Sequence, residues 1–261
     1  MAGNFVQLHN HTHYSLLDGA SKVPDLVKRV KELGMPAVGI TDHGNMHGAY
    51  ELWRAAVDSG VKPIIGIEAY VTPETARQDK TRVSWDTNWT PVPGHARNPD
   101  DVSGGGLITH LTMWAENDEG LVNLIKASSV ANLEGRVMRY PRMDKEVLST
   151  YSKGVIASSG CPSGIIQTRL RLGQFDEALR AAGEFQDIFG KDNFYIELMD
   201  HGLSIESKVT GDLLTIAKKL GAPLLATNDS HYVMEADKDA QDAMLCINSG
   251  ATLDDPNRDR K

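Results

Sequence analysis

Three histidines alternate near the start of the chain, at positions His9, His11 and His13. The apolar residues 5–8 lead into them and are typical of a short β-strand. Because residues i and i+2 of a strand point to the same side, His9 and His11 can direct two imidazole rings at one point. Two converging imidazoles are a frequent part of a metal site, but a single pair also fits a surface run of histidines or a tag remnant.

Further residues of the types that bind metals occur where other β-rich segments end. They are Asp18 in a Leu-Asp-Gly turn, His43 in Thr-Asp-His-Gly, Glu68 in an apolar run, His110, Cys161, Asp229 and His231. Most have a simpler explanation: an aspartate before glycine stabilises a turn, a free cysteine is often an inert buried thiol, and a histidine can cap a helix. A lone carboxylate inside an apolar strand, such as Glu68, is costly unless it has a partner.

Taken together, these nine groups are difficult to explain as independent accidents. Carboxylates gathered without basic residues repel one another unless cations are bound. The mixture of imidazole, carboxylate and one thiolate suits zinc best, and manganese or iron less well. Nine ligands are too many for one tetrahedral ion, so we expect two or three divalent ions with open positions for water and substrate.

The elements that would position these groups alternate between strands and helices. Hydrophobic patterns predict strands over 5–8, 37–41, 64–71, 107–115, 154–158, 194–199 and 223–226. Amphipathic patterns predict helices over 23–33, 46–59, 119–131, 163–172, 174–189, 205–220 and 238–248. This repeat predicts an α/β fold: a parallel sheet closed into a seven-stranded (β/α)7 barrel, TIM-like, with its chemistry at the C-terminal ends of the strands.

One segment, residues 72–106, is too long for an ordinary connection between a strand and a helix. We interpret it as an insertion, which could form a β-hairpin beside the strand ends. A disordered loop is the alternative, although Trp85 and Trp89 favour a segment that packs.

Composition places further limits on the class of protein. The 261 residues carry a net charge of −8, two cysteines and no apolar run of membrane-spanning length, and the N-terminus does not resemble a secretory signal. We therefore expect a cytoplasmic protein without a disulfide framework. The negative charge argues against binding nucleic acid by charge alone, but bound cations can reverse the local field of an acidic site.

Basic residues cluster in three places, and we expect them to lie on solvated helix faces, with phosphate contact as the alternative. The clusters are Lys28, Arg29 and Lys31, then Arg136, Arg139 and Arg142, then Arg169 and Arg171.

The motifs resemble the PHP (polymerase and histidinol phosphatase) family over essentially the whole chain. The resemblance is carried by H-x-H with a downstream L-D-G, T-D-H-G-N, the strand glutamate, T-H-L, S-G-C-P-S-G and N-D-x-H. The strings LHNHTHYSLLDGA, GMPAVGITDHGNMHGA, KPIIGIEAYV, ELMDHGL and ATNDSHYV are similar to the N-terminal PHP domains of bacterial replicative DNA polymerases. The resemblance implies one PHP domain over residues 1–261, a distorted seven-stranded barrel with three metal ions at its mouth.

The resemblance also implies how the ligands are shared. One ion would take His9, His11, Glu68 and Asp229. A second would share Glu68 and take His110 and Cys161. The third would take Asp18, His43 and His231. All nine positions hold liganding residue types, which implies an active site, and we expect Asp229, Glu68 and His11 to act in catalysis.

Other polar residues near these motifs have different expected roles. His13 is not a ligand position of the family, and His47, His95 and His201 are expected to be structural. Asp42 is expected to orient a ligand.

The activity that the resemblance implies is 3′–5′ exonuclease cleavage that proofreads a polymerase product. The substrate would be a single-stranded or mismatched DNA 3′ end, and the partners would be the remaining polymerase domains and the replisome. The catalytic aspartate motif of the polymerase palm is absent, so we do not expect this chain to polymerise DNA. A phosphoesterase of the histidinol-phosphate phosphatase type and a non-catalytic, metal-stabilised structural module remain alternatives.

Overall fold

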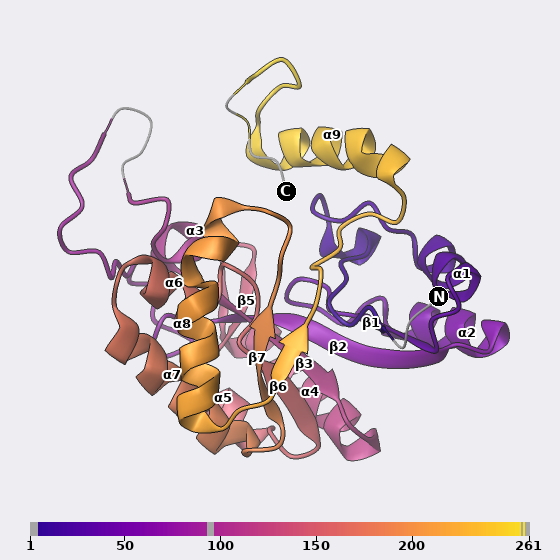
Figure 1. Cartoon of the computed structure of the whole chain (residues 1–261), viewed down its shortest axis with the longest axis horizontal. Coiled ribbons are helices and arrows are strands. Elements are labelled where there is room, and N and C mark those ends of the chain that lie inside the picture. The colour runs from indigo at the N-terminus through magenta and orange to yellow at the C-terminus, as the bar shows by residue number, and fades with distance from the viewer. Residues whose placement is uncertain (1–4, 93–96, 257, 259–261) are drawn as a thin grey trace. The chain divides into compact units, whose positions relative to one another are not determined.

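The structure is a computed structural model that describes residues 5–92, 97–256 and 258 (Figure 1). The chain divides into two compact units. Unit 1 combines Met1–Ile67 with Asn228–Lys261, and unit 2 is Glu68–Thr227. Strand β2 (Lys62–Val71) begins in unit 1 and ends in unit 2.

Unit 1 is built around a short parallel strand pair covered by helices. Its elements are η1 (His13–Ser15), α1 (Val23–Glu32), β1 (Ala37–Ile40), α2 (Ala49–Ser59), the start of β2, η2 (Glu235–Asp237) and α9 (Lys238–Ser249). Strand β1 pairs with β2 from Ala37↔Lys62 to Ile40↔Ile65. The apolar face of α1 packs against α2 and β1, as its helical spacing predicts, and forms a core of Val23, Leu26, Val27, Val30, Val38, Ile40, Leu52, Ala56 and Val61.

The strand expected over residues 5–8 is not formed. This part of the chain makes only isolated bridges, Gln7↔Val38, Asn10↔Ser230 and Thr12↔Ser21, each with a different segment. The Asn10 amide donates to the backbone carbonyls of Gln7 and Gly39, at 3.0 and 2.8 Å. A segment that changes partner every two or three residues cannot build a continuous ladder, so the hydrophobic pattern alone was misleading here.

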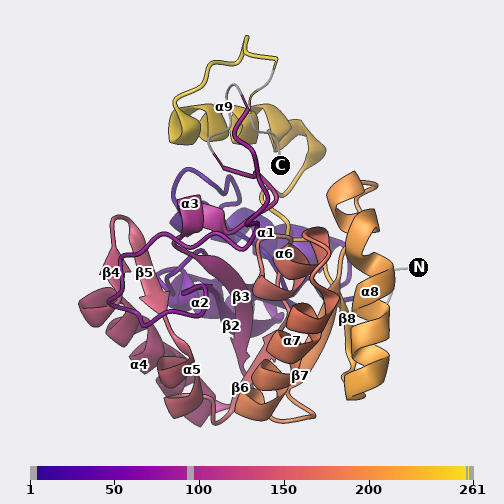
Figure 2. The same cartoon turned by 90° about the vertical axis from the view of Figure 1, so that its left-hand side faces the viewer.

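Unit 2 contains most of the sheet. Its elements are the end of β2, α3 (Ser103–Gly106), β3 (Thr109–Ala115), α4 (Asp118–Glu134), β4 (Arg136–Val137), β5 (Tyr140–Met143), α5 (Lys145–Thr150), β6 (Val155–Ser158), α6 (Ile165–Arg171), α7 (Phe175–Phe189), β7 (Phe194–Leu198), α8 (Ser204–Leu220) and β8 (Leu224–Ala226). The strand order is β4-β5-β2-β3-β6-β7-β8, with β1 pairing to β2 off this path. Helices α7 and α8 pack against β7 (Figure 2).

The sheet is mixed, which corrects the expected parallel seven-stranded barrel. Strands β2 and β5, β6 and β7, and β7 and β8 pair in parallel, but β3 pairs antiparallel with β6, and β4 with β5. Helix α4, the β4–β5 hairpin and α5 lie between β3 and β6 in sequence. The strands of the described residues do not form a closed seven-stranded barrel. No helix in the described part of the chain has the length and apolar character that crossing a bilayer requires.

The described part of segment 72–106 holds α3 but no named strand, so these residues do not form the hairpin that we considered. The segment is nevertheless packed. Trp85 is buried, and the Arg169 guanidinium lies 3.8 Å from the centroid of its ring. The backbone N–H of Trp85 donates to the Asp101 carboxylate. The position of His95 lies outside the described residues.

Three arginines that we expected on solvated faces are buried: Arg142, Arg169 and Arg171. Arg142 is fully buried and donates to the backbone carbonyls of Arg77 and Asp79 at 2.7 and 2.6 Å. Burial lowers the pKa of this guanidinium, yet its hydrogen bonds are to carbonyl groups that would otherwise be left without donors. The charge pattern of the sequence could not show this, because the carbonyls come from a segment about 65 residues away.

Glu74 offers a test of this buried polar packing. Its carboxylate accepts from Arg169 and Arg180, and although burial raises its pKa, these two partners outweigh burial and hold the pKa below the ordinary value. We expect Glu74→Gln to lower the free energy of unfolding by about 1–2 kcal/mol at pH 7. Because the pKa of Glu74 is lower in the folded state than in the unfolded state, where it is about 4.5, its carboxylate stabilises the folded state above pH 4.5. This stabilisation is lost as the pH falls through the pKa of the folded state.

Urea denaturation at pH 7 and pH 3 measures this difference. The exposed Glu32→Gln is the matched control, because its pair with Arg29 is local and solvated. An equal cost of Glu74→Gln at both pH values would show that the charge is not what stabilises the fold.

Candidate metal centre

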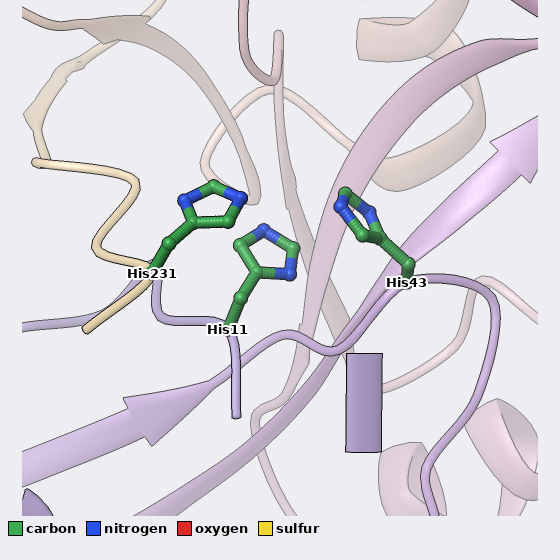
Figure 3. Close-up of side chains that lie close together, drawn as sticks. All are labelled: His11, His43 and His231. Carbon is green, nitrogen blue, oxygen red and sulfur yellow. The ribbon is translucent and has the colours of Figure 1, made fainter. Parts of the chain in front are cut away.

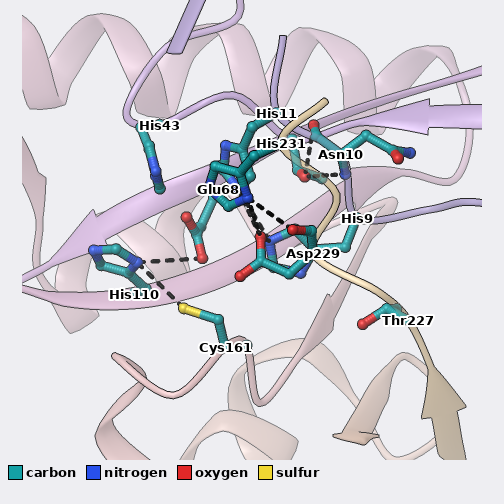
Figure 4. Close-up of polar contacts among 12 residues, drawn as sticks. His9, Asn10, His11, His43, Glu68, His110, Cys161, Thr227, Asp229 and His231 are labelled. Carbon is teal, nitrogen blue, oxygen red and sulfur yellow. Dashed lines mark hydrogen bonds and ion pairs between the residues drawn. The ribbon is translucent and has the colours of Figure 1, made fainter. Parts of the chain in front are cut away.

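The side chains of His9, His11 and Asp229 converge in unit 1 (Figure 4). The two Nε2 atoms lie 3.3 Å apart, and Asp229 Oδ1 lies 3.3 Å from His9 Nε2 and 3.1 Å from His11 Nε2. Neighbouring ligands of a tetrahedral ion with bonds of about 2.0–2.1 Å are separated by about 3.3–3.4 Å. The three atoms therefore fit one triangular face around a divalent ion.

Backbone pairing holds this group together across more than two hundred residues of sequence. The His11 N–H donates to the Ser230 carbonyl at 2.8 Å, and the Ser230 N–H donates to the His9 carbonyl at 3.1 Å. Asp229 has a positive φ of 45°, a conformation that aspartate adopts more readily than most other L-residues. The hydrogen bonds of Ser230 fix the backbone directly after Asp229.

The electrostatics of Asp229 follow from the imidazoles around it. Burial raises the pKa of this carboxyl, but His9, His231 and His11 together outweigh burial and hold the pKa well below its usual range. Asp229 is therefore ionised at neutral pH and available as a ligand.

A second group in unit 1 includes His43, His231 and Asp18. One ring nitrogen each of His11, His43 and His231 lies within 4.8 Å of the others, and the three rings cluster (Figure 3). Asp18 Oδ2 lies 3.2 Å from His43 Nε2, and Asp18 Oδ1 lies 3.9 Å from His231 Nε2. Imidazole nitrogens and a carboxylate facing one another in this way fit a second metal position.

Hydrogen bonds at Nδ1 set which nitrogen of two histidines can bind a metal. His231 Nδ1 donates to the Asp229 carbonyl at 2.7 Å, and His11 Nδ1 lies 3.0 Å from the Ser15 hydroxyl. The Ser15 hydroxyl donates to Asp42 at 2.7 Å, so it accepts from His11. In both rings Nε2 then carries the lone pair, and this tautomer is the one that the two hydrogen bonds assign.

Asp42 is fully buried and organises the loop that follows the first histidines. It accepts from the Thr12 N–H at 2.7 Å, from the Thr12 hydroxyl at 2.9 Å and from Ser15. Burial raises the pKa of Asp42, and these hydrogen bonds oppose that rise. Asp42 thus contacts the candidate ligand His11 through Ser15, and the role of Asp42 in orienting a ligand stays a prediction. The contact of Ser15 was not expected from the sequence, where its only signal is a hydroxyl between two motifs of candidate ligands.

Unit 2 holds the remaining three residues, Glu68, His110 and Cys161 (Figure 4). His110 Nδ1 lies 3.2 Å from Glu68 Oε1 and 3.4 Å from Cys161 Sγ. The backbone N–H of His110 donates to the Ser163 carbonyl at 3.0 Å, which joins the loop that carries Cys161 to β3. A carboxylate, an imidazole and a thiol in contact form a donor set that suits zinc.

Three other histidines lie outside these groups. His13 is exposed and packs on Tyr14, with ring centroids 4.2 Å apart. His47 is exposed, and His201 Nδ1 lies 2.6 Å from Glu206 Oε1.

Comparison with known proteins agrees with this chemistry. The chain belongs to the PHP family: the family model described as "PHP domain" matches residues 7–201. Within it, the chain is similar to part of DNA polymerase III subunit alpha. It is 51% identical over 255 residues to the protein of Mycobacterium leprae, covering 98% of this chain and 21% of that protein. It is 53% identical over 254 residues to the Saccharopolyspora erythraea protein, covering 97% and 21%.

More distant relatives give the same match. The Borreliella burgdorferi DNA polymerase III subunit alpha is 39% identical over 254 residues, covering 97% of this chain and 20% of that protein. The chain therefore spans about one fifth of the length of these relatives. A solved two-domain protein from Bacteroides vulgatus containing a predicted PHP-like metal-dependent phosphoesterase has a TM-score of 0.48 and 13% identity, covering 95% of this chain and 55% of that one. The family assignment rests on the sequence matches.

The contact between Ser15 and His11 leads to a prediction about metal affinity. Because Ser15→Ala removes the acceptor that fixes the His11 tautomer, we expect zinc binding to weaken about tenfold. Calorimetric titration of metal-free protein measures the affinity. Ser129→Ala, an exposed serine of α4 bonded within its own helix, is the control. Equal affinities for Ser15→Ala and wild type would contradict a positioning role.

Metal removal should also destabilise the fold, because the ligand groups then lose their compensating charge. We expect a chelator to lower the melting temperature by about 5 °C or more. In Asp229→Asn one ligand charge is absent, so chelation should lower the melting temperature less. A melting temperature that does not respond to complete chelation would exclude a stabilising metal.

Proposed function

We propose that this chain is a metal-dependent phosphodiesterase that removes nucleotides from DNA 3′ ends, the 3′–5′ proofreading exonuclease of a replicative polymerase. The observation that carries the proposal is the triangle of His9, His11 and Asp229, whose edges of 3.1–3.3 Å fit a divalent ion. Membership of the PHP family and similarity to DNA polymerase III subunit alpha support it.

The proposed cofactors are three divalent ions, with zinc as the best match to the donor set. Their ligands are His9, His11, Asp18, His43, Glu68, His110, Cys161, Asp229 and His231. Ions of this kind lower the pKa of water and neutralise negative charge on a phosphodiester. A manganese or iron ion would suit the imidazoles and carboxylates but not the thiol as well.

The chain's own residues have separate parts in this proposal. Asp229, Glu68 and His11 are the catalytic residues, because they hold the reacting groups in place. Ser15 and Asp42 are positioning residues, which fix the His11 ring and exclude its wrong tautomer. No side chain is required as a covalent nucleophile, since an activated water can attack the phosphorus in line.

The proposed substrate is a single-stranded or mismatched 3′ end, because an unpaired terminus enters a buried site without the cost of separating a base pair. The net charge of −8 fits an enzyme that relies on ions and on other domains for DNA affinity. The remaining polymerase domains and the replisome are then the partners, and the cytoplasm the location.

The test is release of mononucleotides from a 3′-labelled primer-template by the purified chain. We expect Asp229→Asn or a chelator to reduce the rate at least about a hundredfold, because each removes charge stabilisation at the reacting phosphate. Asp58→Asn, an exposed aspartate of α2 paired with Arg54, is the matched control and should cleave normally.

Two outcomes would contradict the proposal. Phosphate release from small monoesters alone would indicate a small-molecule phosphatase. Failure to cleave any substrate with metal bound at full stoichiometry would indicate a structural module.

A further inference from the structure

Two leucines occupy the tip of the loop between the first histidines and Asp18. Leu16 is 76% exposed and Leu17 is 41% exposed. Both have a positive φ, 28° and 61°, a region that L-residues other than asparagine and aspartate rarely adopt. Exposed apolar side chains and a strained backbone at the same two positions both disfavour the folded state. Such a combination indicates a function rather than a contribution to stability.

The ends of this loop are fixed to the candidate metal ligands of unit 1. On one side the Ser15 hydroxyl lies 3.0 Å from His11 Nδ1, and on the other Asp18 Oδ2 lies 3.2 Å from His43 Nε2. The base of the loop is closed by the His13 N–H, which donates to the Ser21 carbonyl at 2.9 Å.

The chain beneath the tip also has no room to move. A Cβ atom on Gly19 would lie 2.3 Å from the Thr12 carbonyl oxygen, so the two backbone segments are in close contact there. Leu16 and Leu17 are therefore held two residues and one residue before Asp18, and they are the exposed large apolar side chains nearest to this candidate ligand in the sequence.

We propose that Leu16 and Leu17 form an apolar lip that contacts the face of the base on the terminal 3′ nucleotide. The inference rests on the proposed function and adds a residue-level account of its specificity. The base is the apolar part of a nucleotide, and aliphatic side chains such as leucine are known to lie against base faces. Every base has such a face, so the contact accepts all four bases, as proofreading requires. A paired terminus has this face stacked on its neighbour, so the lip favours frayed ends.

The experiment compares two otherwise identical oligonucleotides, one with a normal 3′-terminal nucleotide and one with an abasic 3′ terminus. Affinity is measured by fluorescence anisotropy beside cleavage. We expect the wild-type chain to prefer the normal end about tenfold and Leu16→Ala/Leu17→Ala to treat both ends alike. Leu33→Ala, an exposed leucine at the end of α1, is the control and should keep the preference.

A second variant separates this role from a structural one. Leu17→Gly removes the side chain and also relieves the positive φ, so its melting temperature should not fall while the base preference is reduced. Two results would contradict the proposed base contact: equal affinity of the wild-type chain for the normal and the abasic end, or an equal loss of affinity for both ends in the variants. Either result would indicate that the leucines contact protein instead. If the chain binds the normal end more tightly than the abasic end but cleaves neither, the base contact is supported and the proposed exonuclease activity is contradicted.

Discussion

The geometry of unit 1 depends on one arrangement: His9, His11 and Asp229 hold three candidate ligand atoms within 3.1–3.3 Å of one another. The surrounding imidazoles keep the Asp229 carboxyl ionised, and the Nδ1 hydrogen bond of His11 leaves the lone pair of its Nε2 for a metal. A divalent cation between these atoms would attract all three of them, which gives a reason for holding them so close. The structure around them is best understood as the support for this group.

That support comes from several parts of the sequence at once. Backbone hydrogen bonds join the histidine segment to Ser230, and Asp229 adopts a positive φ to direct its carboxylate inward. Asp42, two residues after β1, accepts from the Ser15 hydroxyl, and Ser15 in turn contacts the ring of the candidate ligand His11. Ligands held by hydrogen-bonded neighbours bind more tightly, because less side-chain freedom is lost on binding.

In unit 2, buried arginines have a similar supporting role. Arg142 satisfies backbone carbonyls of segment 72–106, Arg169 packs on Trp85, and Arg171 joins the carbonyls of Asp100 and Pro162. Pro162 directly follows Cys161, so Arg171 connects this segment to the loop that carries a ligand candidate. Segment 72–106 is thus part of the packed structure, because its carbonyl groups accept hydrogen bonds from guanidinium groups that would otherwise be buried without partners.

The sequence by itself determined the family, most helices, and the types and order of the candidate ligand residues, whose role as ligands stays a prediction. Helical periodicity and the residue types that can bind a metal are both properties of short stretches of sequence. Strand direction was not encoded in this way: β3 and β6 have ordinary β patterns, and only the fold decided that they pair antiparallel. The same holds for residues 5–12, where isolated bridges to three successive partners replace a strand. The burial of Arg142 and the role of Ser15 were likewise decided by tertiary structure, because the groups that bind them belong to other segments of the chain.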